Sequence, residues 1–167
     1  MTAATTRIAL AALASSVACA IAAPASAQTL TRKDISVDAA VVIATTAMAD
    51  CKAKGWPVSV AVVGRAGELL VHIRGDGTGP HTMDNSFRKA YTARTTRQPS
   101  GEMAKRLKAD PQLSLVTLPN VVAAQGALPI MIGDDVVGAA GASGAPGGEK
   151  DEACIQTGLD KVQDQLK

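Results

Sequence analysis

Aromatic side chains are nearly absent from this chain, whose 167 residues include one tryptophan, one tyrosine and one phenylalanine. Alanine, valine and glycine supply the apolar content instead, and such small side chains either let helices and strands pack closely or leave room for a flat ligand. No run of basic residues is present, which argues against a nucleic-acid-binding protein. The short motifs of serine hydrolases, kinases and dinucleotide-binding enzymes are also missing.

The first 27 residues have the layout of a secretory signal peptide. Arg7 is their only charged residue, the apolar stretch Ile8–Ala23 follows, and Ala25–Ala27 forms a small-x-small cleavage site. We therefore expect cleavage after residue 27 and a mature protein, residues 28–167, that folds as one domain and is periplasmic or secreted. The alternative is a retained membrane anchor, which the shortness of the apolar stretch disfavours.

Two cysteines remain in the mature chain, Cys51 and Cys154. A pair of thiols in an oxidising compartment favours a disulfide, and two separate buried thiols are the alternative. Closing a loop of about 100 residues contributes roughly 4–5 kcal/mol in the chain-entropy model. If the first and last helices run antiparallel, both cysteines lie where the end of one helix meets the start of the other, which favours the bridge.

Apolar periodicity and turn residues predict the order helix, hairpin, two helices, two or three strands, helix. Helices are predicted at 35–54, 83–98, 100–108 and from 149 onward, and strands at 58–63, 68–74, 121–124, 128–132 and 136–142. Strands linked by hairpins rather than crossovers make an antiparallel sheet. The predicted fold class is therefore α+β, with helices packed on the sheet.

The two histidines of the chain are the candidate metal ligands. His72 falls on the second predicted strand and His81 at the start of the helix that follows. An imidazole binds haem iron or another transition metal, and Met83 and Tyr91 carry iron-ligating groups as well. The alternatives are structural or solvated histidines, and a Met83 and Tyr91 that pack in the core.

Positive charge along the same helix is the candidate anion-binding feature. Arg88, Lys89, Arg94 and Arg97 suit the propionates of haem or a small carboxylate, although a solvated face paired with acids is the alternative. The glycine-rich segment 144–148 precedes the last helix as an anion-binding loop does. Three acids follow it, which disfavours phosphate and leaves a tight turn as the alternative.

Four segments, taken in order, lead to a family. These are the hairpin 58–70, the stretch Phe-Arg-Lys-Ala-Tyr-Thr-Ala at 87–93, the strand Leu-Pro-Ile-Met-Ile at 128–132 and, most specifically, residues 137–154. Together they resemble the GlcG/HbpS family of haem-binding-type proteins, which includes the C-terminal domain of PduO-type corrinoid adenosyltransferases. Gly64 stands where the family usually has Asp, and residues 125–127 are less glycine-rich than in the family.

The resemblance implies a profilin-like layered domain with an antiparallel sheet of about five strands, and homo-oligomers of it. It also implies haem binding. Together with the signal peptide and the histidines near the basic helix, it predicts an exported haem-binding protein, for storage, sensing or scavenging, without turnover of its own. The candidate haem-binding residues are His72, His81, Arg88, Lys89, Tyr91 and Thr92, with His72 and His81 as metal ligands. The alternatives are a binder of an organic acid or corrinoid, a small-molecule enzyme of unknown reaction, and a structural oligomer or signalling partner at the cell surface with a membrane sensor as its partner.

Overall fold

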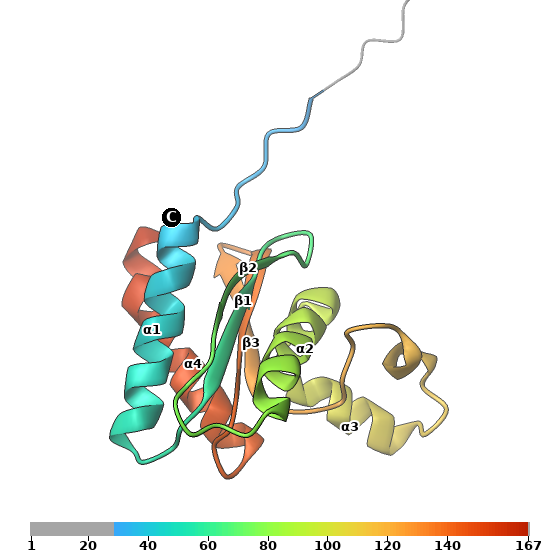
Figure 1. Ribbon diagram of the computed structural model, residues 1–167. Coiled ribbons are helices and arrows are strands. Elements are labelled where there is room, and N and C mark those ends of the chain that lie inside the picture. The colour runs from blue at the N-terminus through green and yellow to red at the C-terminus, as the bar shows by residue number, and fades with distance from the viewer. Residues whose placement is uncertain (1–28, 167) are drawn as a thin grey trace, which may run out of the picture. The chain divides into compact units, whose positions relative to one another are not determined.

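A computed structural model describes residues 29–166 of the chain (Figure 1). The chain divides into two units, Met1–Thr31 and Arg32–Lys167, and the second is the domain described below. The predicted signal peptide, residues 1–27, lies outside the described residues. Within the described range, every helix is too short or too polar to span a bilayer.

The domain is α+β, as predicted, with four α-helices and four strands over the described range. The helices are α1 (Val37–Ala53), α2 (His81–Thr96), α3 (Gly101–Ala109) and α4 (Gly148–Val162), with short 3₁₀ helices at Ser114–Thr117 and Gln163–Gln165. The strands are β1 (Ser59–Val63), β2 (Leu69–Ile73), β3 (Ala127–Ile132) and β4 (Asp135–Ser143). They form one sheet in the order β2-β1-β4-β3, and all three neighbouring pairs are antiparallel.

The sheet has four strands in the described part of the chain, not the five expected, because residues 121–124 do not join it. The backbone N–H of Val122 donates to Thr92 Oγ1 at 2.9 Å, and the carbonyl of Val121 accepts from Arg88 Nη2 at 2.9 Å. Side chains of α2 therefore hold the backbone groups that a neighbouring strand would need.

Helices cover both faces of the sheet, with α1 and α4 on one face and α2 on the other (Figure 1). Side chains alternate along β1, so Val60 and Val62 belong to the core under α1 and α4. Ala61 and Val63 point to the other side, where the core under α2 is built mainly from alanines. The two faces thus differ in side-chain size.

A disulfide joins the two helices of the first face, as predicted. Cys51 near the end of α1 is bonded to Cys154 in the first half of α4, with their Cα atoms 5.6 Å apart. Figure 1 shows the two helices running in opposite directions, which is the arrangement that brings those two ends together. The sequence separation of 103 residues makes this link a long-range one.

Candidate functional site

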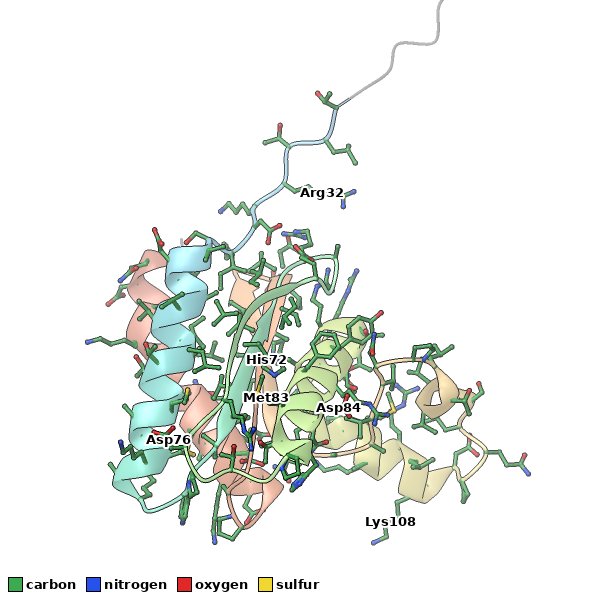
Figure 2. All side chains as sticks on the ribbon, in the orientation of Figure 1. Arg32, His72, Asp76, Met83, Asp84 and Lys108 are labelled. Atoms are coloured by element: carbon green, nitrogen blue, oxygen red, sulfur yellow. A yellow bond between two sulfur atoms is a disulfide. The ribbon has the colours of Figure 1, made fainter. Side chains whose placement is uncertain are left out.

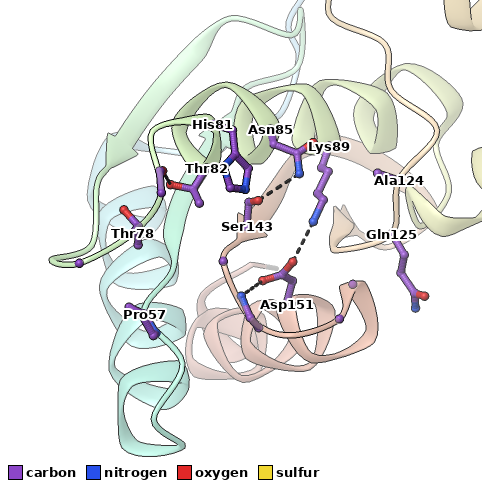
Figure 3. A pocket seen from close by; sticks show the side chains of 16 residues that line it. Pro57, Thr78, His81, Thr82, Asn85, Lys89, Ala124, Gln125, Ser143 and Asp151 are labelled. Carbon is purple, nitrogen blue, oxygen red and sulfur yellow. Dashed lines mark hydrogen bonds and ion pairs between the residues drawn. The ribbon is translucent and has the colours of Figure 1, made fainter.

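A cavity of about 420 Å³ lies where the N-terminal ends of α2 and α4 approach each other (Figure 3). The turn after β2 and the loop after β4 complete its walls. The volume is within the usual range of small-molecule sites. Its polar side chains come from segments that are far apart in the sequence: Thr78, His81, Thr82, Asn85, Lys89, Gln125, Ser143 and Asp151.

A buried ion pair forms one wall of the cavity. Lys89 Nζ donates to Asp151 Oδ2 at 2.8 Å and to the carbonyl of Ala142 at 3.1 Å. The other carboxylate oxygen, Asp151 Oδ1, accepts from the backbone N–H of Ala145 at 3.0 Å. The side chains of Lys89 and Asp151 are only 5% and 3% exposed. These bonds tie α2, β4 and α4 together at the cavity.

Gly126 gives the ion pair its space. Its φ of +132° is a backbone conformation that favours glycine, and a Cβ there would lie 2.7 Å from Lys89 Nζ and 2.9 Å from Asp151 Cβ. A larger residue at position 126 would therefore separate the two charged groups. The connection between α3 and β3 shapes the site in this way.

Hydroxyl groups fix the start of α2 beside the cavity. Ser59 Oγ and Thr82 Oγ1 are 2.8 Å apart, and Thr82 Oγ1 also donates to the carbonyl of Gly79 at 2.8 Å. One turn further along α2, Asn85 Nδ2 donates to Ser143 Oγ at 3.0 Å. The first two turns of α2 are thereby held against β1 and the end of β4.

His81 is the histidine of the cavity. It is the first residue of α2, it is exposed, and its ring lies along the cavity (Figure 3). A Cβ on Gly79 would come within 2.9 Å of His81 Cε1, so glycine at that position leaves room for the ring. Within the described residues neither ring nitrogen has a hydrogen-bond partner. The imidazole is therefore available to a ligand.

His72 lies elsewhere, between β2 and α2 (Figure 2). Its Nε2 is 3.0 Å from the carbonyl of Met83 and 3.2 Å from Ser86 Oγ. Because a carbonyl only accepts, Nε2 carries the proton and donates to Met83. Burial lowers the pKa of His72, and the hydrogen bond to Met83 opposes part of that shift. The Nε2 atom of His72 is therefore engaged by groups of the fold itself.

The remaining predicted ligand residues belong to other surfaces of α2. Arg88 donates to the carbonyl of Val121 at 2.9 Å, and Thr92 Oγ1 donates to the carbonyl of Arg88 at 2.8 Å. The ring of Tyr91 packs at 6.0 Å from that of Phe87. The structure therefore brings His81 and Lys89 to the cavity and leaves His72, Arg88, Tyr91 and Thr92 outside it.

Sequence reasoning missed Asn85, Gln125 and Asp151 as parts of this site. In the local sequence Asp151 is an ordinary acid in the first turn of a helix, where its negative charge interacts favourably with the helix dipole. Its partner Lys89 is 62 positions away, a separation that no local pattern reports. The available signal was the segment 137–154, the most specific of the family-like stretches, which contains Asp151.

Comparison with known proteins agrees with the resemblance seen in the sequence. A family model described as "Haem degrading protein HbpS-like" matches residues 35–160. This chain belongs to the HbpS-like family. A solved structure of Streptomyces reticuli HbpS, a double mutant, is 35% identical with a TM-score of 0.77, and the match covers 84% of this chain and 97% of that one.

Two further relatives are similar over shorter stretches or at lower identity. An uncharacterised 15.0 kDa protein from the dhaT-dhaS intergenic region of Citrobacter freundii is 34% identical over 107 residues, which are 62% of this chain and 75% of that protein. The structure of a PduOC–haem complex has a TM-score of 0.70 at 20% identity, covering 77% of this chain and 94% of that one. At that identity the second likeness concerns the fold alone.

Proposed function

We propose that this protein binds haem, with His81 as a ligand of the iron and the propionates held in the cavity beside it. The observation that carries the proposal is the placement of an exposed imidazole, without hydrogen bonds inside the described chain, at a cavity that contains buried Lys89. Membership of a family described as haem degrading, and the haem complex of the structurally similar PduOC, support haem as the ligand.

The residues of the cavity fit the polar end of haem better than its ring. Lys89 has three N–H donors and uses two of them within the protein, which leaves one for a carboxylate. The N-terminal ends of α2 and α4 both border the cavity and favour negative charge. Apolar lining is limited mainly to Pro57, Ala124 and Ala145. Most of the macrocycle would therefore lie at the open side of the cavity.

Bound haem would supply a coloured, redox-active iron, and the protein would supply the His81 imidazole to hold it and groups that bind its carboxylates. We expect purified protein to shift the Soret band of added haem and His81→Ala to lose that shift. His72→Gln is the matched control, because a glutamine amide still donates to the Met83 carbonyl and lies outside the cavity. An unshifted band with the wild type would reject haem binding, and a lost shift in His72→Gln alone would reject His81 as the ligand.

Retention of the haem, rather than its turnover, is the second part of the proposal. Lys89 and Asp151 are bonded to each other, and His81 would be bound to iron, so the ionisable side chains of the cavity are occupied. We expect the bound Soret band to persist under air with a reductant. Loss of the band at a rate above that of free haem would instead indicate degradation, the activity that the family description names.

A small organic acid is the second candidate ligand, and the polar lining of the cavity favours it. A carboxylate alone would use the remaining donor of Lys89 and the helix ends, and the cavity would have no apolar ring to accommodate. Thermal unfolding in the presence of organic acids or haem separates the candidates, because a ligand that binds the folded state raises the melting temperature. Stabilisation by the acids without any effect of haem would favour the second candidate.

Export is the third part of the proposal. The Cys51–Cys154 disulfide supports an oxidising compartment, in agreement with the secretory layout of residues 1–27. We expect the protein to be recovered from the periplasm or medium with its N-terminus at Gln28. A homo-oligomer is a prediction from the family resemblance, and size-exclusion chromatography tests it. A membrane sensor as partner is a separate hypothesis, which co-purification tests.

A further inference from the structure

We propose a second ligand site, specific for a small oxyanion such as phosphate or a carboxylate, between the β1–β2 turn and the C-terminal half of α2. A separate cavity of about 130 Å³ lies there, lined by Arg65, Ala66, Gly67, Tyr91, Arg94 and Thr95. This is the space of about four water molecules at roughly 30 Å³ each, enough for an anion of a few heavy atoms. It shares no lining residue with the larger cavity at His81.

Arg94 is the residue that points to a ligand. Its guanidinium makes no hydrogen bond and no ion pair with the described residues, and its Nε is fully buried without a partner. A guanidinium carries five N–H donors and stays charged, so burying one of them unpaired costs free energy. The Nη groups of Arg94 also have no partner among the described residues, and an oxyanion in the adjoining cavity would provide acceptors for them.

The charges around Arg94 favour an anion. Arg65 and Arg97 are its basic neighbours, and Asp135 and Glu68 are its acidic ones. Arg65 and Asp135 form an ion pair, with hydrogen bonds of 3.0 and 2.6 Å, so their charges offset each other. Glu68, which accepts from the backbone N–H of Ala66, is the acid left against both Arg94 and Arg97. Burial, followed by repulsion from Arg97 and Arg65, lowers the pKa of Arg94. The local positive charge is therefore incompletely balanced.

Further donors surround the cavity. The hydroxyl groups of Tyr91 and Thr95 have no hydrogen-bond partner among the described side chains and backbone groups. A Cβ on Gly67 would lie 2.8 Å from Tyr91 Cε2, so glycine lets the turn approach the ring beside the cavity. The residues that line the cavity thus carry two hydroxyl groups and a planar guanidinium, donor types that suit a carboxylate or phosphate.

Nuclear magnetic resonance of the ¹⁵N-labelled full protein tests the site directly, with inorganic phosphate and acetate titrated separately at constant ionic strength. We expect at least one of them to shift the Arg94 Nε–Hε signal and the amides of Ala66 and Gly67 in a saturable way. Arg94→Gln should weaken that binding about tenfold or more. Arg106→Gln removes an exposed arginine of α3 and should leave the affinity unchanged.

Arg94→Lys is the second variant, because it keeps the charge and removes the planar fork, and it should bind several-fold more weakly than the wild type. It also serves if Arg94→Gln does not fold. Wild-type shifts that stay linear in concentration for both anions, or that occur at Gly147 and Gly148 of the other cavity instead, would overturn the proposal. Folded Arg94 variants with wild-type affinity would overturn it as well.

Discussion

Breaking the buried ion pair between Lys89 and Asp151 should destabilise the protein strongly. Lys89→Met keeps the length of the side chain and removes its charge. The Asp151 carboxylate then stays inside the fold, with the N–H of Ala145 as its remaining partner. Both side chains are at most 5% exposed, and removing one partner of such a pair costs about 3–5 kcal/mol. For a domain of this size, the melting temperature should fall by roughly 10–20 °C.

An exposed lysine–carboxylate ion pair in α3 provides a matched control. Lys105 Nζ is 2.6 Å from Glu102 Oε1 in α3, and the side chains are 75% and 41% exposed. Lys105→Met should cost only about 0.5 kcal/mol, because solvent screens the pair. Urea unfolding followed by circular dichroism measures both variants. If Lys89→Met lost no more stability than Lys105→Met, the reasoning from burial would be refuted.

A double variant separates the lost attraction from the stranded charge. Asp151→Asn keeps an oxygen that accepts from the Ala145 N–H but removes the negative charge. We therefore expect Lys89→Met/Asp151→Asn to be more stable than Lys89→Met alone, since no uncompensated charge stays buried. Strict additivity of the two single substitutions would contradict this expectation.

Two further predictions concern the disulfide and His72. Cys51→Ser/Cys154→Ser should lower the free energy of unfolding by about 4–5 kcal/mol, because the bond closes a loop of about 100 residues; an unchanged urea midpoint on reduction of the wild type would contradict it. Burial lowers the pKa of His72, so the unfolded chain binds more protons below about pH 6.5 and stability falls as the pH decreases through that range. His72→Gln should reduce this slope, and an identical pH dependence of the urea midpoint would reject the assignment.

Local sequence patterns were sufficient for most of the fold. The β-branched run at 58–63 and the glycines of the following turn predict a hairpin, and β1 and β2 form one. The same reasoning failed at 121–124, where two adjacent valines have the propensity of a strand but their backbone is bonded to Arg88 and Thr92 of α2. Secondary-structure propensity describes the conformation that a segment favours. The hydrogen-bond partners available in the fold decide which conformation it adopts.

The site was less predictable because its residues are joined by tertiary contacts. Both histidines were predicted as metal ligands, yet β2 directs His72 against α2 while His81 begins that helix at the cavity. Lys89 was predicted as an anion-binding residue, but its buried partner Asp151 follows only from the packing of α4 against β4. The spacing of residues along one segment does not show which distant residues will pack against it.

The scarcity of aromatic residues has a structural consequence that links the core to the cavity. On the α2 face of the sheet, a Cβ on Gly141 would lie 2.6 Å from the carbonyl oxygen of Ser86 and 2.8 Å from the nitrogen of Ala90. The backbone of α2 therefore lies directly on β4, where a large side chain would hold it away. This close approach lets Lys89 reach past β4, bonding the Ala142 carbonyl on its way to Asp151. Small residues thus let the middle of α2 pack tightly on β4. That packing positions Lys89 and Asp151, which form the charged wall of the cavity near the N-terminal end of α2.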